Sequence, residues 1–144
     1  MKHLKKGHSP AVNHQKASTV LTIGNFDGLH KGHLKLINKV VLLAKKLGTA
    51  SLVCSFDANT KNTSNLIFPQ NQLRDALSEI GVDYFTKLRF TKEVKDLSCQ
   101  EFVKQYLVER FNCKAVVVGE NFYFGKDKEG DANTLKQLGA KYGF

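Results

Sequence analysis

Apolar residues along the chain alternate between two kinds of pattern. Short continuous runs rich in β-branched residues indicate buried strands, whereas apolar positions that recur every three or four residues indicate amphipathic helices. The strand-like runs cover residues 19–23, 50–56, 82–88 and 115–118. The helix-like stretches cover residues 32–47, 69–80 and 102–111. This alternation predicts an α/β fold, a Rossmann-like doubly wound parallel sheet with helices on both faces.

Capping residues support two of these boundaries. Lys45 and Lys46 followed by Gly48 are typical of a helix C-terminus, and Ser98 with Glu101 has the spacing of a capping box that opens the next helix. Between the second strand and the second helix, the polar stretch 57–65 predicts a loop.

The end of the chain predicts a short helix over Thr134–Leu138 and the first residues of a fifth strand at Tyr142–Phe144. We therefore expect one domain over residues 18–144, truncated in or before its fifth strand, after a basic tail over residues 1–17. A parallel sheet without its last strand leaves an edge uncovered, so self-association through that edge is expected.

Charge and composition narrow the class of partner. The formal net charge is +9, which favours anionic ligands such as a nucleotide. The lysines are scattered rather than gathered with aromatics into one stripe, so a solvated surface explains most of them and nucleic-acid binding is a minor alternative. No apolar run approaches the ~20 residues that span a bilayer. The three separated cysteines show no disulfide framework, and we expect a cytoplasmic protein.

The decamer GNFDGLHKGH at residues 24–33 joins the first predicted strand to the first predicted helix. The N–H groups at a helix start favour a bound phosphate, and glycines let the backbone approach it. His30 and His33 lie three residues apart with Gly32 between them, so both can donate hydrogen bonds to oxygens that gain charge during an in-line displacement. The pattern indicates phosphoryl-type chemistry, in which the protein positions reactants and neutralises charge.

Two plainer interpretations of the paired histidines stay open. They could bind zinc with Asp27 as a third ligand, or they could form a structural helix cap. A glycine-rich turn between strand and helix suits phosphate better than zinc, so we predict no metal held by protein side chains.

Together with a second block, the decamer resembles a known family. GNFDGLHKGH is similar to the first motif of the FMN adenylyltransferase module of prokaryotic FAD synthetases, in the nucleotidylyltransferase superfamily that shares His-x-Gly-His. The later motifs of that module resemble EFVKQYLVERF at residues 101–111 and VVVGENFYFGKDKEGD at residues 116–131. The resemblance covers roughly residues 19–144, and the last block is the most discriminating part.

The resemblance implies transfer of AMP from ATP to FMN, which yields FAD and pyrophosphate, with Mg²⁺ accompanying the ATP. It implies that His30 and His33 stabilise the ATP phosphates and that Asn121 lies near the flavin phosphate and the reacting centre. The residues implied to bind ATP are Gly24, Asn25, Phe26, Asp27 and Gly32.

Phe122 and Phe124 alternate beside Asn121. They either form a wall of the FMN pocket or simply pack the loop. Because loops 24–33 and 119–131 both follow predicted parallel strands directly, we expect them on the same rim of the sheet, where ligands bind in such folds.

Departures from the family pattern keep other functions open. The stretch FDANT at residues 56–60 stands where the family commonly has Phe-x-Pro-His-Pro. The family's Ser-Ser-Thr-x-x-Arg motif and its riboflavin kinase barrel have no counterpart in residues 1–144. The main alternative is therefore a non-catalytic nucleotide- or flavin-binding remnant. Another His-x-Gly-His nucleotidylyltransferase and a charge-driven nucleic-acid binder are the remaining alternatives.

Overall fold

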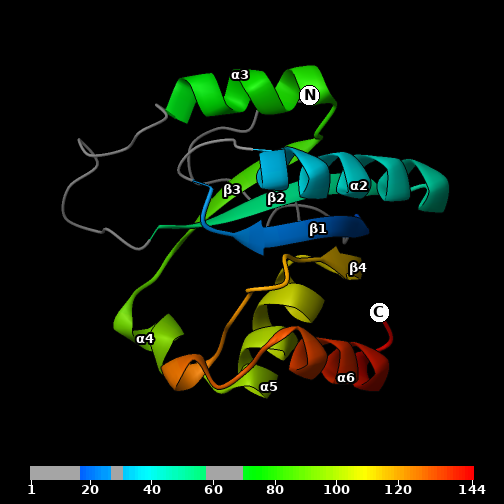
Figure 1. The fold of residues 1–144 in the computed structure, drawn as a ribbon. Helices are drawn as coiled ribbons and strands as arrows, with labels where there is room; N and C mark the ends of the chain where they lie inside the picture. The colour runs from blue at the N-terminus through cyan, green and yellow to red at the C-terminus, as the bar shows by residue number, and fades with distance from the viewer. Residues whose placement is uncertain (1–16, 27–30, 58–69) are drawn as a thin grey trace.

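A four-stranded parallel sheet forms the centre of the protein in a computed structural model that describes residues 17–26, 31–57 and 70–144. The strand order is β3-β2-β1-β4, and all three pairings are parallel. Helices cover both faces of the sheet (Figure 1). The predicted α/β class with a doubly wound parallel sheet is confirmed. The strands are β1 (Thr19–Gly24), β2 (Ala50–Asp57), β3 (Tyr84–Arg89) and β4 (Cys113–Val117).

One face of the sheet is covered by α2 (Lys31–Leu47) and α3 (Gln70–Ile80) (Figure 1). Val40 and Ala44 of α2 are buried against Val20 of β1. These positions belong to the apolar stripe that predicted the helix, so burial of that stripe holds α2 on the sheet.

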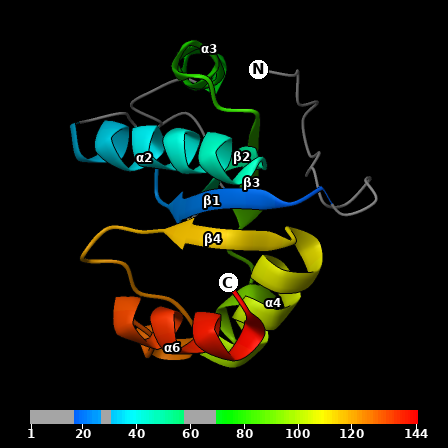
Figure 2. The ribbon, with the colours of Figure 1, turned by 90° about the vertical axis from the view of Figure 1, so that its right-hand side faces the viewer.

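The other face is covered by four helical segments that lie below the strands in Figure 2. Phe102, Leu107 and Phe111 belong to the same buried cluster as Leu21 and Leu52 of the sheet. The segments are α4 (Lys92–Lys95), α5 (Cys99–Phe102), the π-helix η2 (Val103–Arg110) and α6 (Ala132–Tyr142), and a short 3₁₀ turn, η3 (Lys126–Lys128), precedes α6.

The helix predicted over 102–111 starts as expected and then widens. The Ser98 hydroxyl accepts from the Glu101 N–H at 3.1 Å, and the Glu101 carboxylate accepts from the Ser98 N–H at 3.0 Å, so the capping box is present. These hydrogen bonds lower the pKa of Glu101. Further on, the Phe111 N–H donates to the Tyr106 carbonyl five residues earlier at 2.9 Å. Apolar spacing does not distinguish this π-helical turn from an ordinary α-helix.

The C-terminal prediction of a fifth strand at Tyr142–Phe144 is wrong. Asp131 caps α6, its carboxylate accepting from the Thr134 N–H at 2.9 Å, and the helix continues through Gly139 to Tyr142. Gly143 then adopts a left-handed conformation with φ 87°, and its N–H and that of Phe144 both donate to the Gly139 carbonyl at 2.8 Å. The glycine that ends the helix is therefore the later one, and α6 is longer than predicted.

The third strand begins later than the apolar run at 82–88 predicts, because side-chain hydrogen bonds occupy its first residues. The Asp83 N–H donates to the Ser51 hydroxyl at 2.8 Å, and the Asp83 carboxylate accepts from the Ser51 N–H at 2.9 Å.

Among the described helices, none combines the length and the apolar character that a bilayer crossing requires.

The strand order places a topological switch point between β1 and β4. From β1 the chain proceeds to β2 and β3 on one side and then returns to pair β4 with the other side of β1. Ligands in such sheets bind at the carboxyl ends of the strands beside this point. In the described sheet β3 and β4 are the outer strands, and self-association through an edge stays a prediction.

Candidate functional site

A cavity of about 870 Å³ opens at the carboxyl ends of β1 and β4, at the switch point. We call it the rim cavity. It is lined by strand ends, by both motif-bearing loops and by one flank of α2. The lining residues are Ile23, Gly24, Asn25, Phe26, Gly32, His33, Lys35, Leu36, Lys39, Phe56, Val117, Val118, Gly119, Glu120, Asn121, Phe122 and Tyr123.

On the β1 side, Phe26 fixes the start of the first loop. Its side chain is buried, and its N–H donates to the hydroxyl of Ser55 on β2 at 3.1 Å. The rings of Phe26 and His33 are in edge-to-face contact, with 4.8 Å between their centroids and 64° between their planes. His33 lies in the first turn of α2 and is half-buried. Its imidazole is therefore held beside the positive end of the helix dipole, where an anion is favoured.

On the β4 side, a tight turn presents the second loop to the cavity. The Phe122 N–H donates to the Gly119 carbonyl at 3.2 Å, which closes the turn. Asn121 is exposed, and Tyr123 keeps 54% of its surface exposed. Alternation places residues i and i+2 on one side only in an extended strand, and the chain turns just before Phe122, so alternation does not decide where Phe122 and Phe124 lie.

Phe124 lies in the core and does not line the rim cavity. It is 5% exposed, stacks on Phe122 with centroids 5.5 Å apart, and contacts the ring of Phe102 with centroids 6.0 Å apart. Of the two alternating aromatics, Phe122 lines the cavity and Phe124 supports it from behind.

Two glycines hold the second loop against the start of α5. A Cβ atom at Gly125 or at Gly130 would lie 2.5 Å from the Cys99 sulfur, closer than side chains tolerate. Gly125 also has φ 82°, which favours glycine. The Phe124 N–H and the Gly130 carbonyl form a hydrogen bond of 3.0 Å across the loop. The glycine spacing of the second block therefore reflects close packing, which fixes the turn that carries Asn121.

The ionisable groups of the rim cavity suit an anion. Lys35 and Lys39 project from α2, two and six residues after His33, and Glu120 is the carboxylate on the opposite loop. Within the described ranges, no group of three His, Cys, Asp or Glu side chains is arranged to hold a metal ion.

The described cysteines do not supply a reactive thiolate. Burial raises the pKa values of Cys54 and Cys113 to about 12, and burial also raises the pKa of Cys99. These thiols are protonated at neutral pH and are not nucleophiles. None of the three lines the rim cavity.

The structure brings most of the predicted site residues together, while their roles stay predictions. His30 and Asp27 lie outside the described residues. The predicted residues that meet in the rim cavity are Gly24, Asn25, Phe26, Gly32, His33, Asn121 and Phe122.

Ten lining residues are not among the predicted site residues, and five of these ten carry a charged or aromatic side chain: Lys35, Lys39, Phe56, Glu120 and Tyr123. The two lysines are four residues apart on one helix, and that i, i+4 spacing could have identified them as neighbours. Tyr123 could not be found by alternation, because the loop turns at this point.

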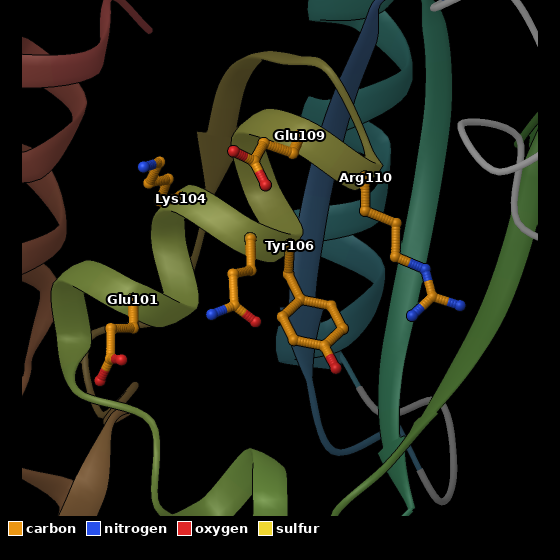
Figure 3. Close-up of a pocket in the computed structure, with 6 residues that line it drawn as sticks. Glu101, Lys104, Tyr106, Glu109 and Arg110 are labelled. Carbon is orange, nitrogen blue, oxygen red and sulfur yellow. The ribbon is translucent and has the colours of Figure 1, made fainter.

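A second hollow of about 650 Å³ lies on the outer side of η2, and Figure 3 shows it. We call it the helix hollow. The Tyr106 ring stacks on Phe102 with centroids 5.3 Å apart, and the Arg110 guanidinium lies 5.5 Å from the Tyr106 ring. Glu101 is engaged in the capping box. These are structural roles, so the rim cavity is the candidate site. The helix hollow is lined by Glu101, Lys104, Gln105, Tyr106, Glu109 and Arg110.

Comparisons with known proteins identify the family of the chain. The FAD synthetase family matches residues 12–144. The bifunctional riboflavin kinase/FMN adenylyltransferase of Escherichia coli K12 is 36% identical over 132 residues, which cover 87% of this chain and 42% of that protein. The protein of the same name from Pseudomonas fluorescens is 33% identical over 130 residues, again 87% and 42% of the two chains.

The fold has a counterpart among solved structures. A crystal structure described as a macrolide-efflux protein from Streptococcus pneumoniae superposes with a TM-score of 0.74 at 27% identity, covering 85% of this chain and 49% of that one. The chain thus spans 42% of the length of both bifunctional relatives and about half of the solved one. With its family pattern matched from residue 12 to residue 144, the chain belongs to the FAD synthetase family.

Proposed function

We propose that the rim cavity binds ATP and FMN and transfers AMP from ATP to FMN, giving FAD and pyrophosphate. The observation that carries this proposal is the convergence of two separate motif blocks on one cavity, with His33 from one block and Asn121 from the other. The names of the bifunctional relatives include this activity. Because the chain matches 42% of their length, the proposal concerns only the adenylyl-transfer step.

The proposed reaction is an in-line displacement. A phosphate oxygen of FMN attacks the α-phosphorus of ATP, and the bond from that phosphorus to the bridging oxygen breaks, so pyrophosphate leaves with the electron pair. We assign His33 to donate hydrogen bonds to phosphate oxygens that gain negative charge, beside the N-terminus of α2. His30 is proposed for the same role. We assign Asn121 to contact the FMN phosphate, since its amide can both donate and accept.

Mg²⁺ enters this proposal as part of the substrate Mg-ATP. Mg²⁺ commonly keeps several waters and binds through substrate phosphates with one or two carboxylates. Glu120 is the carboxylate that lines the described rim cavity, which fits a metal held mainly by the nucleotide.

Aromatic side chains provide a surface for the flavin ring. Phe56, Phe122 and Tyr123 all line the rim cavity. A planar isoalloxazine can stack on such faces, and Phe124 behind Phe122 keeps that ring in place.

The test is incubation of the full chain with Mg-ATP and FMN, with FAD separated and quantified by chromatography. Formation of FAD that depends on all three components is expected. A folded protein that produces no FAD would overturn the catalytic proposal. If it still binds ATP and FMN in titrations, the non-catalytic binding module becomes the better description.

A further inference from the structure

Ser55 carries a buried hydroxyl at the carboxyl end of β2 that the proposed reaction does not use. Its side chain is 2% exposed, and it does not line the rim cavity. In the register of the sheet it lies beside Gly24, the last residue of β1. Burial of a hydroxyl is costly unless it is hydrogen-bonded, and Ser55 accepts from the Phe26 N–H of the first motif-bearing loop at 3.1 Å.

This hydrogen bond fixes the backbone of Phe26. The Phe26 N–H lies two residues beyond the end of β1, so it takes its acceptor from a side chain instead of from the strand ladder. The Phe26 ring belongs to a buried cluster that includes Ile37 of α2 and Val53 of β2. Apolar burial is non-directional, whereas a hydrogen bond depends on angle, so the hydroxyl adds the direction that packing alone does not supply.

The Phe26 ring passes this constraint to the candidate site, because its ring is in edge-to-face contact with that of His33. A contact chain thus runs from β2 through the loop to α2, and it ends at the imidazole that lines the rim cavity. Misplacement of a reacting group by about 1 Å can lower a rate on the order of a hundredfold. The direction of the His33 ring is therefore a property that a buried hydrogen bond can control.

We propose that Ser55 is a positioning residue for His33: its hydroxyl holds Phe26, and Phe26 holds the imidazole in the direction that reaches the reacting phosphate. The inference rests on the proposed function for the role of His33 in transfer. The contact chain itself can be tested without any turnover.

The test uses Ser55→Ala and the isosteric pair Ser55→Thr and Ser55→Val, which differ from each other in the hydroxyl. Ser51→Ala is the matched control. Ser51 is also buried on β2, its hydroxyl also accepts from a backbone N–H, that of Asp83 at 2.8 Å, and it lies about 13 Å along the strand from residue 55. The control therefore removes a similar hydrogen bond at the other end of the same strand.

The first readout is the proton NMR spectrum of the imidazole. The ring-proton resonances of His33 are identified by their absence in His33→Gln, and the nearby Phe26 ring displaces them by its ring current. This displacement should shrink in Ser55→Ala and Ser55→Val. It should be retained in Ser55→Thr and Ser51→Ala.

The second readout is the rate of FAD formation. In Ser55→Ala and Ser55→Val, kcat should fall about tenfold while the KM for ATP changes less than about twofold, because the loss concerns orientation during transfer more than binding of the nucleotide. Ser55→Thr should exceed Ser55→Val in kcat. In a His33→Ala background, Ser55→Ala should lower kcat no further, since residues that act through one another are not additive.

Unmoved His33 resonances in a folded Ser55→Ala protein would overturn the contact chain, whatever the activity. Moved resonances with an unchanged kcat, or an equal loss of kcat in Ser51→Ala, would overturn the positioning role. A wild-type chain that forms no FAD overturns the proposed function, and the NMR comparison then decides by itself whether Ser55 orients His33.

Discussion

The rim cavity and the helix hollow differ in what their side chains already do. In the helix hollow, Arg110 lies over Tyr106 and Glu101 caps α5, so two of its charged groups and its aromatic ring are engaged in holding the helix. In the rim cavity, Lys35 and Lys39 are exposed beside a helix N-terminus, and Tyr123 shows more than half of its surface. The two hollows therefore differ: side chains of the helix hollow stabilise the fold, and those of the rim cavity are the candidates for contact with a ligand.

Of the substitutions in the two hollows, replacement of His33 should have the largest effect on FAD formation. His33→Ala removes a donor aimed at the proposed reacting phosphate, so the rate of FAD formation should fall about 100- to 1000-fold. His33→Gln retains a side-chain donor and should lose less. Because the His33 ring contacts Phe26, its loss could disturb the fold. The circular dichroism spectra of both variants must therefore match that of the wild type. Full activity in a folded His33→Ala protein would contradict the assigned role.

The packing between the two hollows is tested at Gly130. A Cβ there would lie 2.5 Å from the Cys99 sulfur and 3.0 Å from the Phe124 carbonyl oxygen, so Gly130→Ala should cost about 2 kcal/mol and lower Tm by roughly 5–10 °C. Because Gly130 holds the loop that carries Asn121, FAD formation should fall as well.

Gly48→Ala is the matched control for this substitution. Gly48 has φ 69°, and a Cβ atom added there would meet no other atom within 4 Å. The substitution should therefore destabilise the fold only by the cost of holding alanine in a left-handed conformation, about 1 kcal/mol. It lies at the far end of α2 and should leave the KM for FMN unchanged. A smaller loss of Tm for Gly130→Ala than for Gly48→Ala would contradict the packing argument.

The aromatic surface of the rim cavity is tested at Tyr123. Tyr123→Ala should raise the KM for FMN about 3- to 10-fold, since an aromatic stack contributes about 0.5–1.5 kcal/mol. Tyr123→Phe keeps the ring and should behave as the wild type. Because the side chain is largely exposed, neither variant should change Tm appreciably. Equal KM values for the Ala and Phe variants would remove Tyr123 from the flavin surface.

The smallest effect is expected in the helix hollow. Arg110→Gln removes a cation–π contact of about 0.5–1 kcal/mol, so Tm should fall by only a few degrees. The KM for ATP and the KM for FMN should both be unchanged. A selective rise in either KM would show that the hollow takes part in binding and would remove the contrast between the two hollows.

Local patterns predicted those parts of the fold in which one force dominates. The apolar stripe of α2 is buried where its spacing indicates, and Ser98 caps α5 as its spacing to Glu101 indicates. The wrong prediction at Tyr142–Phe144 arose where two glycines compete to end a helix. Gly139 tolerates the helix interior, and Gly143 supplies the left-handed turn, a choice that packing against Phe144 decides.

The motif residues of the candidate site could be predicted from the sequence, whereas most of the other residues that line the rim cavity could not. Gly24, His33 and Asn121 were predicted from the two motif blocks and the family resemblance, and they meet in the rim cavity, as expected for loops that follow parallel strands. Phe124 could not be separated from Phe122, because the turn at 119–122 interrupts alternation. Lys35 and Lys39 were missed because a charged helix face is usually only solvated, and their place beside the cavity depends on how α2 lies against β4.

The central place of β1 has a consequence for the order of folding. β1 gains its neighbour β4 only when the chain closes a very long loop: the Thr19 hydroxyl donates to the Phe111 carbonyl at 2.8 Å across 92 residues. During synthesis, the segment up to β3 can pair its strands while the far wall of the site is still inside the ribosome. Such distant pairing is slow. The nucleotide binding proposed for the rim cavity requires chains that have completed this closure, so a bound substrate would favour the closed chain by mass action.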